Sequence, residues 1–191
     1  MKNALPAAVL ALVTGSALAA PVKYDVDPNH THPSFATDHF GGLSVWRGLF
    51  DVSSGSIELD KEKATGSVEI TVDMSSVDFG LPKLSEHVKS AEMFDVQKYP
   101  TATYKGKLTK FRNGAPTEVQ GELTMHGVTK PVNLTIDQFK CMINPMSKKE
   151  VCGADAAGTL NRADFGVNYG EKMGFKQEVK LAIQVEAIKA G

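Results

Sequence analysis

The 191-residue sequence has few cysteines, few aromatic residues and no excess of charge of either sign. Its 21 Lys and Arg and 22 Asp and Glu give a formal net charge of −1, and the two signs are mixed along the chain. No basic stripe of the kind that neutralises phosphates is present, so we expect no nucleic-acid partner. The sequence also lacks a Gly-x-Ser-x-Gly nucleophile motif and a recognised Ser-His-Asp order, so we expect no catalytic residues.

Long apolar runs are missing after the N-terminus. The one extended run, residues 4–18, follows Lys2 and ends in the small-x-small pattern of residues 17–19, which signal peptidase reads. It is shorter than the ~20 residues that span a bilayer. We therefore expect a signal peptide over residues 1–19, one mature domain over 20–191, a periplasmic location and no stable membrane insertion.

Two cysteines, Cys141 and Cys152, flank a polar loop sequence. An exported protein can keep such a pair oxidised, so we expect a disulfide. A metal site is not expected, because no CxxC spacing or additional histidine accompanies the pair. His30 and His32 share one face of a strand, but His39 has the opposite parity and the other histidines are distant in sequence. We expect no metal and no cofactor.

Alternation of apolar and polar residues with a period of two dominates the mature sequence and predicts half-buried strands. The pattern is found over residues 33–39, 46–52, 57–59, 68–73, 102–108, 119–125, 132–136, 154–160 and 179–186. Asn113-Gly114 supplies the positive φ angles of a tight turn between two of these strands. One segment instead repeats apolar residues at three- and four-residue steps from Leu84 to Phe94, which predicts a short helix after Pro82, with Ser85 as its cap.

About eight antiparallel strands with one helix fit a closed barrel better than an open sheet. A barrel of ~8 strands holds either packed side chains or one slender ligand. The inward positions mix large residues such as Phe35 and Trp46 with small ones such as Gly48, Gly121 and Gly158. Small residues either leave a narrow apolar groove or sit at tight strand crossings in a solid core, and parity alone leaves both interpretations open.

Several segments resemble, in order and spacing, the YceI-like family of exported bacterial lipid-binding proteins. They lie at residues 27–31, 46–50 (Trp-Arg-Gly-Leu-Phe), 87–95, 121–132 and 161–167, within a resemblance that spans residues 22–188. Five segments in order are far more specific than any one motif.

The resemblance implies an all-β fold, an eight-stranded antiparallel lipocalin-like β-barrel with one short helix near one end. It implies binding, storage or transport of a long-chain isoprenoid, quinone or fatty-acyl lipid inside the barrel, and no enzyme activity. An enzyme or redox partner acting on a bound quinone, and a solid-core interaction module, are the alternatives. A homodimer and a monomer are both compatible with the sequence.

We expect the ligand to contact apolar side chains on the inward strand faces and the helix segment. These are Phe35, Trp46, Phe50, Val68, Ile70, Val72, Met74, Leu84, Val88, Met93, Phe94, Tyr104, Leu108, Leu123, Met125 and Phe165. His39, His87 and Arg162 form the expected polar mouth, beside a glycine-rich loop at residues 166–175 that we interpret as an entry lid. His39 either meets a polar head group or bonds to backbone, and Arg162 either pairs with Asp164 or binds an anionic head group.

Overall fold

The computed structural model describes residues 20–191, and the expected signal peptide, residues 1–19, lies outside this part of the chain. Strands are joined by one α-helix, α1 (Pro82–Lys89), and three short 3-10 helices, η1 (Met74–Ser76), η2 (Arg162–Phe165) and η3 (Glu171–Met173). The strands are β1 (Val22–Val26), β2 (Ser34–His39), β3 (Ser44–Phe50), β4 (Ser53–Asp60), β5 (Thr65–Asp73), β6 (Val77–Asp78), β7 (Thr101–Thr109), β8 (Glu118–Met125), β9 (Val128–Pro131), β10 (Leu134–Ile143), β11 (Glu150–Asn161) and β12 (Glu178–Lys189).

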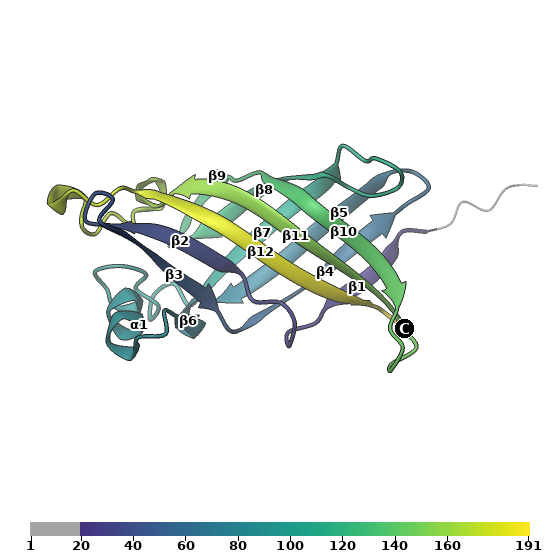
Figure 1. Ribbon diagram of the computed structural model, residues 1–191, viewed down its shortest axis with the longest axis horizontal. Helices are drawn as coiled ribbons and strands as arrows, with labels where there is room; N and C mark the ends of the chain where they lie inside the picture. Colours follow the sequence, from purple (N-terminus) through teal and green to yellow (C-terminus); the bar gives the residue numbers. More distant parts are fainter. Residues whose placement is uncertain (1–19) are drawn as a thin grey trace, which may run out of the picture.

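Eight of these strands close a barrel in the order β1-β4-β5-β7-β8-β10-β11-β12, and the pairing of β12 with β1 completes the ring (Figure 1). Every pairing in the ring is antiparallel. The predicted closed, eight-stranded antiparallel barrel is therefore confirmed.

The period-two alternation places the predicted residues on the inner face. On β5, Val68 and Ile70 stand opposite Gly106 and Tyr104 of β7, and Tyr104 in turn stands opposite Leu123 of β8. The turn between β7 and β8 carries the expected Asn113-Gly114, with φ angles of 51° and 77°. Both angles are positive, as a two-residue turn with the twist of the flanking strands requires.

On the edge away from β11, strand β12 pairs with two different strands, which the sequence did not predict. Its last residues pair with β1, whereas its first residues pair with β2, where Val179 faces Thr37. Between these two stretches, the buried Thr31 takes the place of a strand neighbour. Its hydroxyl donates to the Glu186 carbonyl at 3.2 Å and accepts from the Glu186 N–H at 3.1 Å. Strands β2 and β3 thus extend the wall at one end of the barrel.

Helix α1 lies at the same end as the β2–β3 loop, as predicted (Figure 1). It begins at Pro82, whose fixed φ suits the first helical turn, and Leu81 before it makes no side-chain cap. The expectation that Ser85 caps the helix is wrong. Ser85 lies inside the helix, where its hydroxyl accepts from the Phe79 N–H at 3.1 Å and ties the preceding loop to the helix.

The opposite end of the barrel, which we call the closed end, is densely packed. Tyr24, Leu59, Leu108 and Ala187 keep at most 7% of their surface exposed. The predicted disulfide between Cys141 and Cys152 is confirmed and joins directly opposed residues of β10 and β11. None of the helices in residues 20–191 combines the length and the apolar character needed to cross a bilayer.

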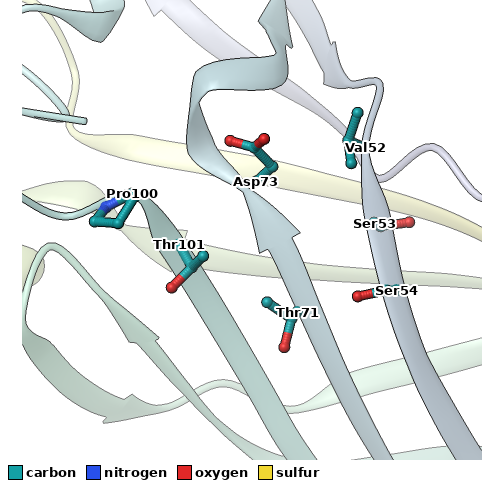
Figure 2. Close-up of a pocket in the computed structure, with 7 residues that line it drawn as sticks. All are labelled: Val52, Ser53, Ser54, Thr71, Asp73, Pro100 and Thr101. Atoms are coloured by element: carbon teal, nitrogen blue, oxygen red, sulfur yellow. The ribbon is translucent and has the colours of Figure 1, made fainter. Parts of the chain in front are cut away.

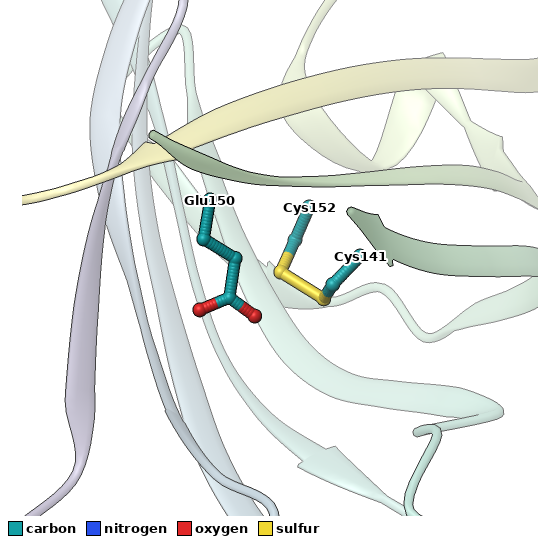
Figure 3. Close-up of side chains that lie close together, drawn as sticks. All are labelled: Cys141, Glu150 and Cys152. Carbon is teal, nitrogen blue, oxygen red and sulfur yellow. A yellow bond between two sulfur atoms is a disulfide. The ribbon is translucent and has the colours of Figure 1, made fainter. Parts of the chain in front are cut away.

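Glu150 lies beside the disulfide (Figure 3), and its carboxylate belongs to an ion network at the closed end. The Glu150 carboxylate lies 3.0 Å from the Lys61 ammonium and 3.9 Å from that of Lys189. The hydrogen bond from Lys61 is the main reason that the pKa of Glu150 is lowered. Burial, reinforced by Glu150, raises the pKa of Tyr24. This end is sealed by apolar packing inside and by paired charges outside.

Candidate functional site: the barrel interior at the helix end

Between the closed end and α1, one set of inward-facing apolar side chains keeps part of its surface exposed. Met74, Met125 and Phe165, close to α1, are as buried as the residues of the closed end. Because the partly exposed side chains point away from the outer surface, we infer that their exposed part faces the barrel interior. We call this region the interior chamber. Its half-buried side chains are Phe35, Phe50, Val68, Ile70, Val72, Tyr104, Leu123, Leu181 and Ile183. The chamber is lined almost entirely by carbon, which suits an apolar ligand.

Tyr104 is the polar exception among these residues, and the protein itself satisfies its hydroxyl. The hydroxyl donates to the Val132 carbonyl at 2.9 Å, and burial raises the pKa of the phenol. The ring lies over Gly121, where a Cβ would overlap the Tyr104 hydroxyl. Tyr104 therefore offers the chamber an aromatic face and no free polar group.

The small inward residues do not form the groove that the sequence suggested as one interpretation. A Cβ at Gly48 would lie 2.8 Å from the Phe35 ring, and one at Gly158 would lie 2.7 Å from a Leu134 methyl group. The space beside these glycines is thus taken by larger neighbours, as in the solid-core interpretation. The free surface of the chamber comes instead from the large apolar residues.

A series of aromatic rings leads from the chamber to the mouth at the α1 end, and we call it the aromatic chain. Its successive ring centroids are 4.7 to 6.5 Å apart, within the usual range for aromatic pairs. The order is Phe94, Phe50, Phe35, Phe79, Trp46, His39, Phe175 and Phe40. Phe40 is 54% exposed, so the chain connects the chamber to the outer rim.

His39 lies inside this aromatic chain, half-buried at the end of β2. Its ring is 4.5 Å from that of Phe40, 5.6 Å from Trp46 and 5.4 Å from Phe175, measured between centroids. Its Nδ1 is 3.5 Å from the Ser44 hydroxyl. Of the two alternatives for His39, no backbone hydrogen bond to its ring is found within residues 20–191, and the Ser44 hydroxyl is its hydrogen-bond partner.

Arg162 holds the loop at residues 166–175. Its guanidinium is buried and donates to the carbonyls of Val167 and Tyr169 at 2.9 and 2.8 Å. Burial lowers the pKa of Arg162. Asp164 is exposed, and the ion pairs of residues 20–191 do not join it to Arg162, so the expected Arg162–Asp164 pairing is wrong. The arginine is a clamp on loop carbonyls.

His87 connects α1 to the same loop. Its ring lies 4.9 Å from the Tyr169 ring in an edge-on arrangement, and its Nδ1 lies 3.9 Å from a Glu92 carboxylate oxygen. Since Arg162 holds the Tyr169 carbonyl, the helix and the loop meet across the mouth of the barrel. The three expected polar residues therefore lie at one end of the barrel, but each already has protein partners.

The remaining residues of the expected lining fall into two groups. Five are buried against other protein groups and would have to move before touching a ligand; these are Met74, Val88, Leu108, Met125 and Phe165. Leu84, Met93, Phe94 and Trp46 are partly exposed near α1 and the mouth.

Four rim residues were missed by the sequence reasoning: Phe40, Phe79, Tyr169 and Phe175. All four adjoin glycines, in Phe40-Gly41, Phe79-Gly80, Tyr169-Gly170 and Gly174-Phe175. Aromatic residues flanked by glycine do not alternate with polar ones, so a search for strand periodicity overlooks them. The sequence signal for these residues is an aromatic residue next to a glycine in a loop.

Two hollows lie on the outside of the barrel, separate from the chamber. The first, of about 190 Å³, is lined by Ser54, Thr71, Asp73 and their neighbours on β4, β5 and β7 (Figure 2). The second, of about 510 Å³, lies over the outer face of β10, β11 and β12. Neither lines the aromatic chain.

A model of the YceI-like domain matches residues 24–187. The chain belongs to the YceI-like family. The protein named Protein YceI from Salmonella arizonae is 33% identical to this YceI-like chain over 184 residues, which covers 95% of this chain and 94% of that protein. The matched residues run from β1 to β12 and include the chamber and its mouth.

Solved structures share the YceI-like barrel. BcnA from Burkholderia cenocepacia has 25% sequence identity and a TM-score of 0.66, covering 85% of this chain and 99% of its own. A protein from Saccharophagus degradans, described as a polyisoprenoid binding domain implicated in plant cell wall breakdown, has 15% identity and a TM-score of 0.63. That match covers 88% of this chain and 99% of the other, and it shows a common fold.

Proposed function

We propose that this YceI-like protein binds a long-chain isoprenoid lipid in the interior chamber and carries or stores it in the periplasm. The observation that carries the proposal is the set of inward apolar side chains that keep solvent-exposed surface inside the barrel. Each methylene that such a surface removes from water contributes ~0.8 kcal/mol. A prenyl tail of several units can therefore bind without a specific polar contact.

The ligand class is supported by a structural relative. The Saccharophagus degradans protein with the same barrel is described as a polyisoprenoid binding domain. We extend this ligand class to the present chain because its own chamber is apolar and bordered by aromatic rings.

In the proposed complex, the tail lies along the aromatic chain and the polar head lies at the mouth near His39 and Ser44. His39 is half-buried, and its imidazole and the Ser44 hydroxyl both lie at the rim of the aromatic chain. Arg162 supports this arrangement indirectly, since its hydrogen bonds hold the loop that borders the mouth.

Extraction of natively purified protein with organic solvent, followed by mass spectrometry, tests the proposal. We expect an isoprenoid species in molar proportion to protein. A protein that is empty as isolated and that takes up no added polyprenyl lipid would contradict the proposal.

A matched pair of variants then locates the ligand. Ile70→Trp fills chamber space, and we expect it to weaken binding roughly tenfold or more, because the bulk displaces several methylenes of the tail. Ser67→Trp places the same side chain on the outer face of the same strand and should leave affinity unchanged. Equal affinities for the two variants would place the lipid outside the chamber.

Export is tested separately. We propose cleavage after Ala19, so N-terminal sequencing of the protein released by osmotic shock should begin at Ala20. Recovery of the uncleaved chain in the cytoplasmic fraction would overturn the proposed location and leave the binding proposal to its own test.

A further inference from the structure

The end of β10 and the turn that joins it to β11, residues 140–149 together, expose apolar side chains at the closed end of the barrel. We call this segment the hairpin tip. Met146 is 89% exposed, Ile143 59% and Met142 50%. Ile143 and Met142 follow each other on a strand and so point to opposite faces of the hairpin, while Met146 lies in the turn itself. Exposed apolar side chains therefore lie on both faces of the tip and at its turn.

The hairpin tip is also basic. Lys140, Lys148 and Lys149 are exposed, and residues 140–149 contain no Asp or Glu. Glu150, the next acidic residue, is paired with Lys61 and receives a hydrogen bond from Tyr24. None of the three lysines is in an ion pair within residues 20–191, although Asp155 and Glu186 line the same outer hollow as Lys140.

The hairpin tip is held in a defined conformation. The Asn144 side-chain oxygen accepts from the N–H groups of Met146 and Ser147 at 2.8 and 3.1 Å, and the Asn144 carbonyl accepts from the Lys148 N–H at 2.9 Å. The disulfide joins the two strands at the base of the tip. The exposure of Met146 therefore comes from an ordered turn that projects it into solvent.

We propose that the hairpin tip docks the protein on an anionic lipid surface. Apolar side chains that enter the boundary between head groups and acyl chains, with lysines beside the lipid phosphates, are the pattern of interfacial binding. The apolar groups and the charges of the tip both fit such a surface. Docking in this way leaves the mouth at the α1 end free. It is independent of whether the chamber holds a lipid.

The rim of the mouth, the other exposed apolar surface, fits an anionic membrane less well. Leu43 is 77% exposed and Met173 52%, but Glu171 adjoins Lys172 there and the charges offset each other. The rim therefore provides the control for the tip.

Flotation with lipid vesicles tests the proposal. The protein should bind vesicles made of equal parts phosphatidylcholine and phosphatidylglycerol, bind phosphatidylcholine vesicles weakly, and lose binding as salt screens the charges. Replacing Lys140, Lys148 and Lys149 together by Gln should lower the partition coefficient roughly a hundredfold, since each lysine near an anionic surface contributes about fivefold. The double variant Ile143→Ser, Met146→Ser should lower it roughly tenfold or more.

The matched control is the rim double variant Leu43→Ser, Met173→Ser, which should bind vesicles like the unchanged protein. Circular dichroism should show all variants folded, since the substituted side chains are exposed. The proposal is overturned if the protein does not prefer anionic vesicles, if the tip variants bind as well as the parent, or if the rim variant loses more binding than the tip variants. Lipid extracted from the tip variants should match that of the parent, so failure of docking and failure of lipid binding are distinguishable.

Discussion

At the scale of single residues, buried polar groups join loops to strands in this barrel. The Thr31 hydroxyl pairs with both the N–H and the carbonyl of Glu186, at the one place where β12 has left β1 and has not yet reached β2. The Thr31 carbonyl also accepts from the buried Ser53 hydroxyl at 2.8 Å. One threonine therefore joins the loop between β1 and β2 to two strands.

Thr31→Val should destabilise the protein by about 2 kcal/mol. The substitution keeps the shape of the side chain but leaves the Glu186 N–H without this partner, and an unpaired buried polar group costs about 1–3 kcal/mol. The Glu186 carbonyl still accepts from the Asp27 N–H at 2.9 Å. Thr159→Val, on the exposed outer face of β11, should change stability by less than about 0.5 kcal/mol. Denaturant unfolding of both variants measures the difference. Equal effects would show that the Thr31 hydroxyl bonds contribute nothing.

The pair formed by His30 and Asp27 gives a prediction about pH. The His30 Nδ1 donates to an Asp27 carboxylate oxygen at 2.8 Å, which lowers the pKa of Asp27 and raises that of His30. Both groups are charged between about pH 4 and pH 6.5, so the pair stabilises the fold in that window. The contribution is lost above it as His30 loses its proton and below it as Asp27 gains one.

NMR titration of the His30 ring checks this. In Asp27→Asn the pKa of His30 should fall back to about 6.5. In Asp25→Asn, which removes the neighbouring partner of Lys23 instead, it should stay raised. A His30 pKa that is the same in all three proteins would contradict the pairing.

At the scale of elements, periodicity predicted the strands that alternate cleanly and failed where pairing depends on distant segments. The inward faces of β5, β7, β8, β11 and β12 follow directly from their apolar residues. The closing strand β1 and the division of β12 between β1 and β2 depend on which distant segments meet, and alternation carries no information about that. The start of α1 was misplaced because Pro82 at the first turn was read as a signal before the helix, although proline is itself favoured there.

The disulfide belongs to this scale because it joins neighbouring strands of one hairpin. Replacing Cys141 and Cys152 together by Ser should lower the free energy of unfolding by about 3 kcal/mol, because the unfolded chain loses the constraint on a short loop. Reduction of the unchanged protein should have a similar effect on denaturant unfolding, and reduction of the double variant should have none. An unchanged midpoint after reduction would show that the bond does not contribute.

At the scale of the whole molecule, the two ends of the barrel differ. Both ends contain deeply buried side chains, but the half-buried residues that border the chamber, and the aromatic chain, lie toward α1. The sequence predicted the apolar character of the interior from parity. It did not predict which inward residues would keep exposed surface. The space beside Gly48 and Gly121 is occupied by the rings of Phe35 and Tyr104, and this depends on the direction of side chains from neighbouring strands.

Removal of lipid should therefore lower the stability of the entire barrel. If the protein holds its ligand at about a hundredfold excess over Kd, binding adds about 2.7 kcal/mol to the free energy of unfolding. For a chain of this size that corresponds to a loss of roughly 5–10 °C in Tm on stripping. Calorimetry of native, stripped and reloaded protein measures it. An identical Tm for the native and stripped forms would argue against an internal ligand.

The pairing of one edge of β12 with both β1 and β2 has a consequence for the entrance of the barrel. The ring that includes β1 and the last residues of β12 does not depend on the pairing of β2 with the first residues of the same strand. Parting of β2 from β12 would enlarge the entrance while the base stays hydrogen-bonded. Under the proposed function, loading and unloading would proceed through such a local opening, without passage through an unfolded state.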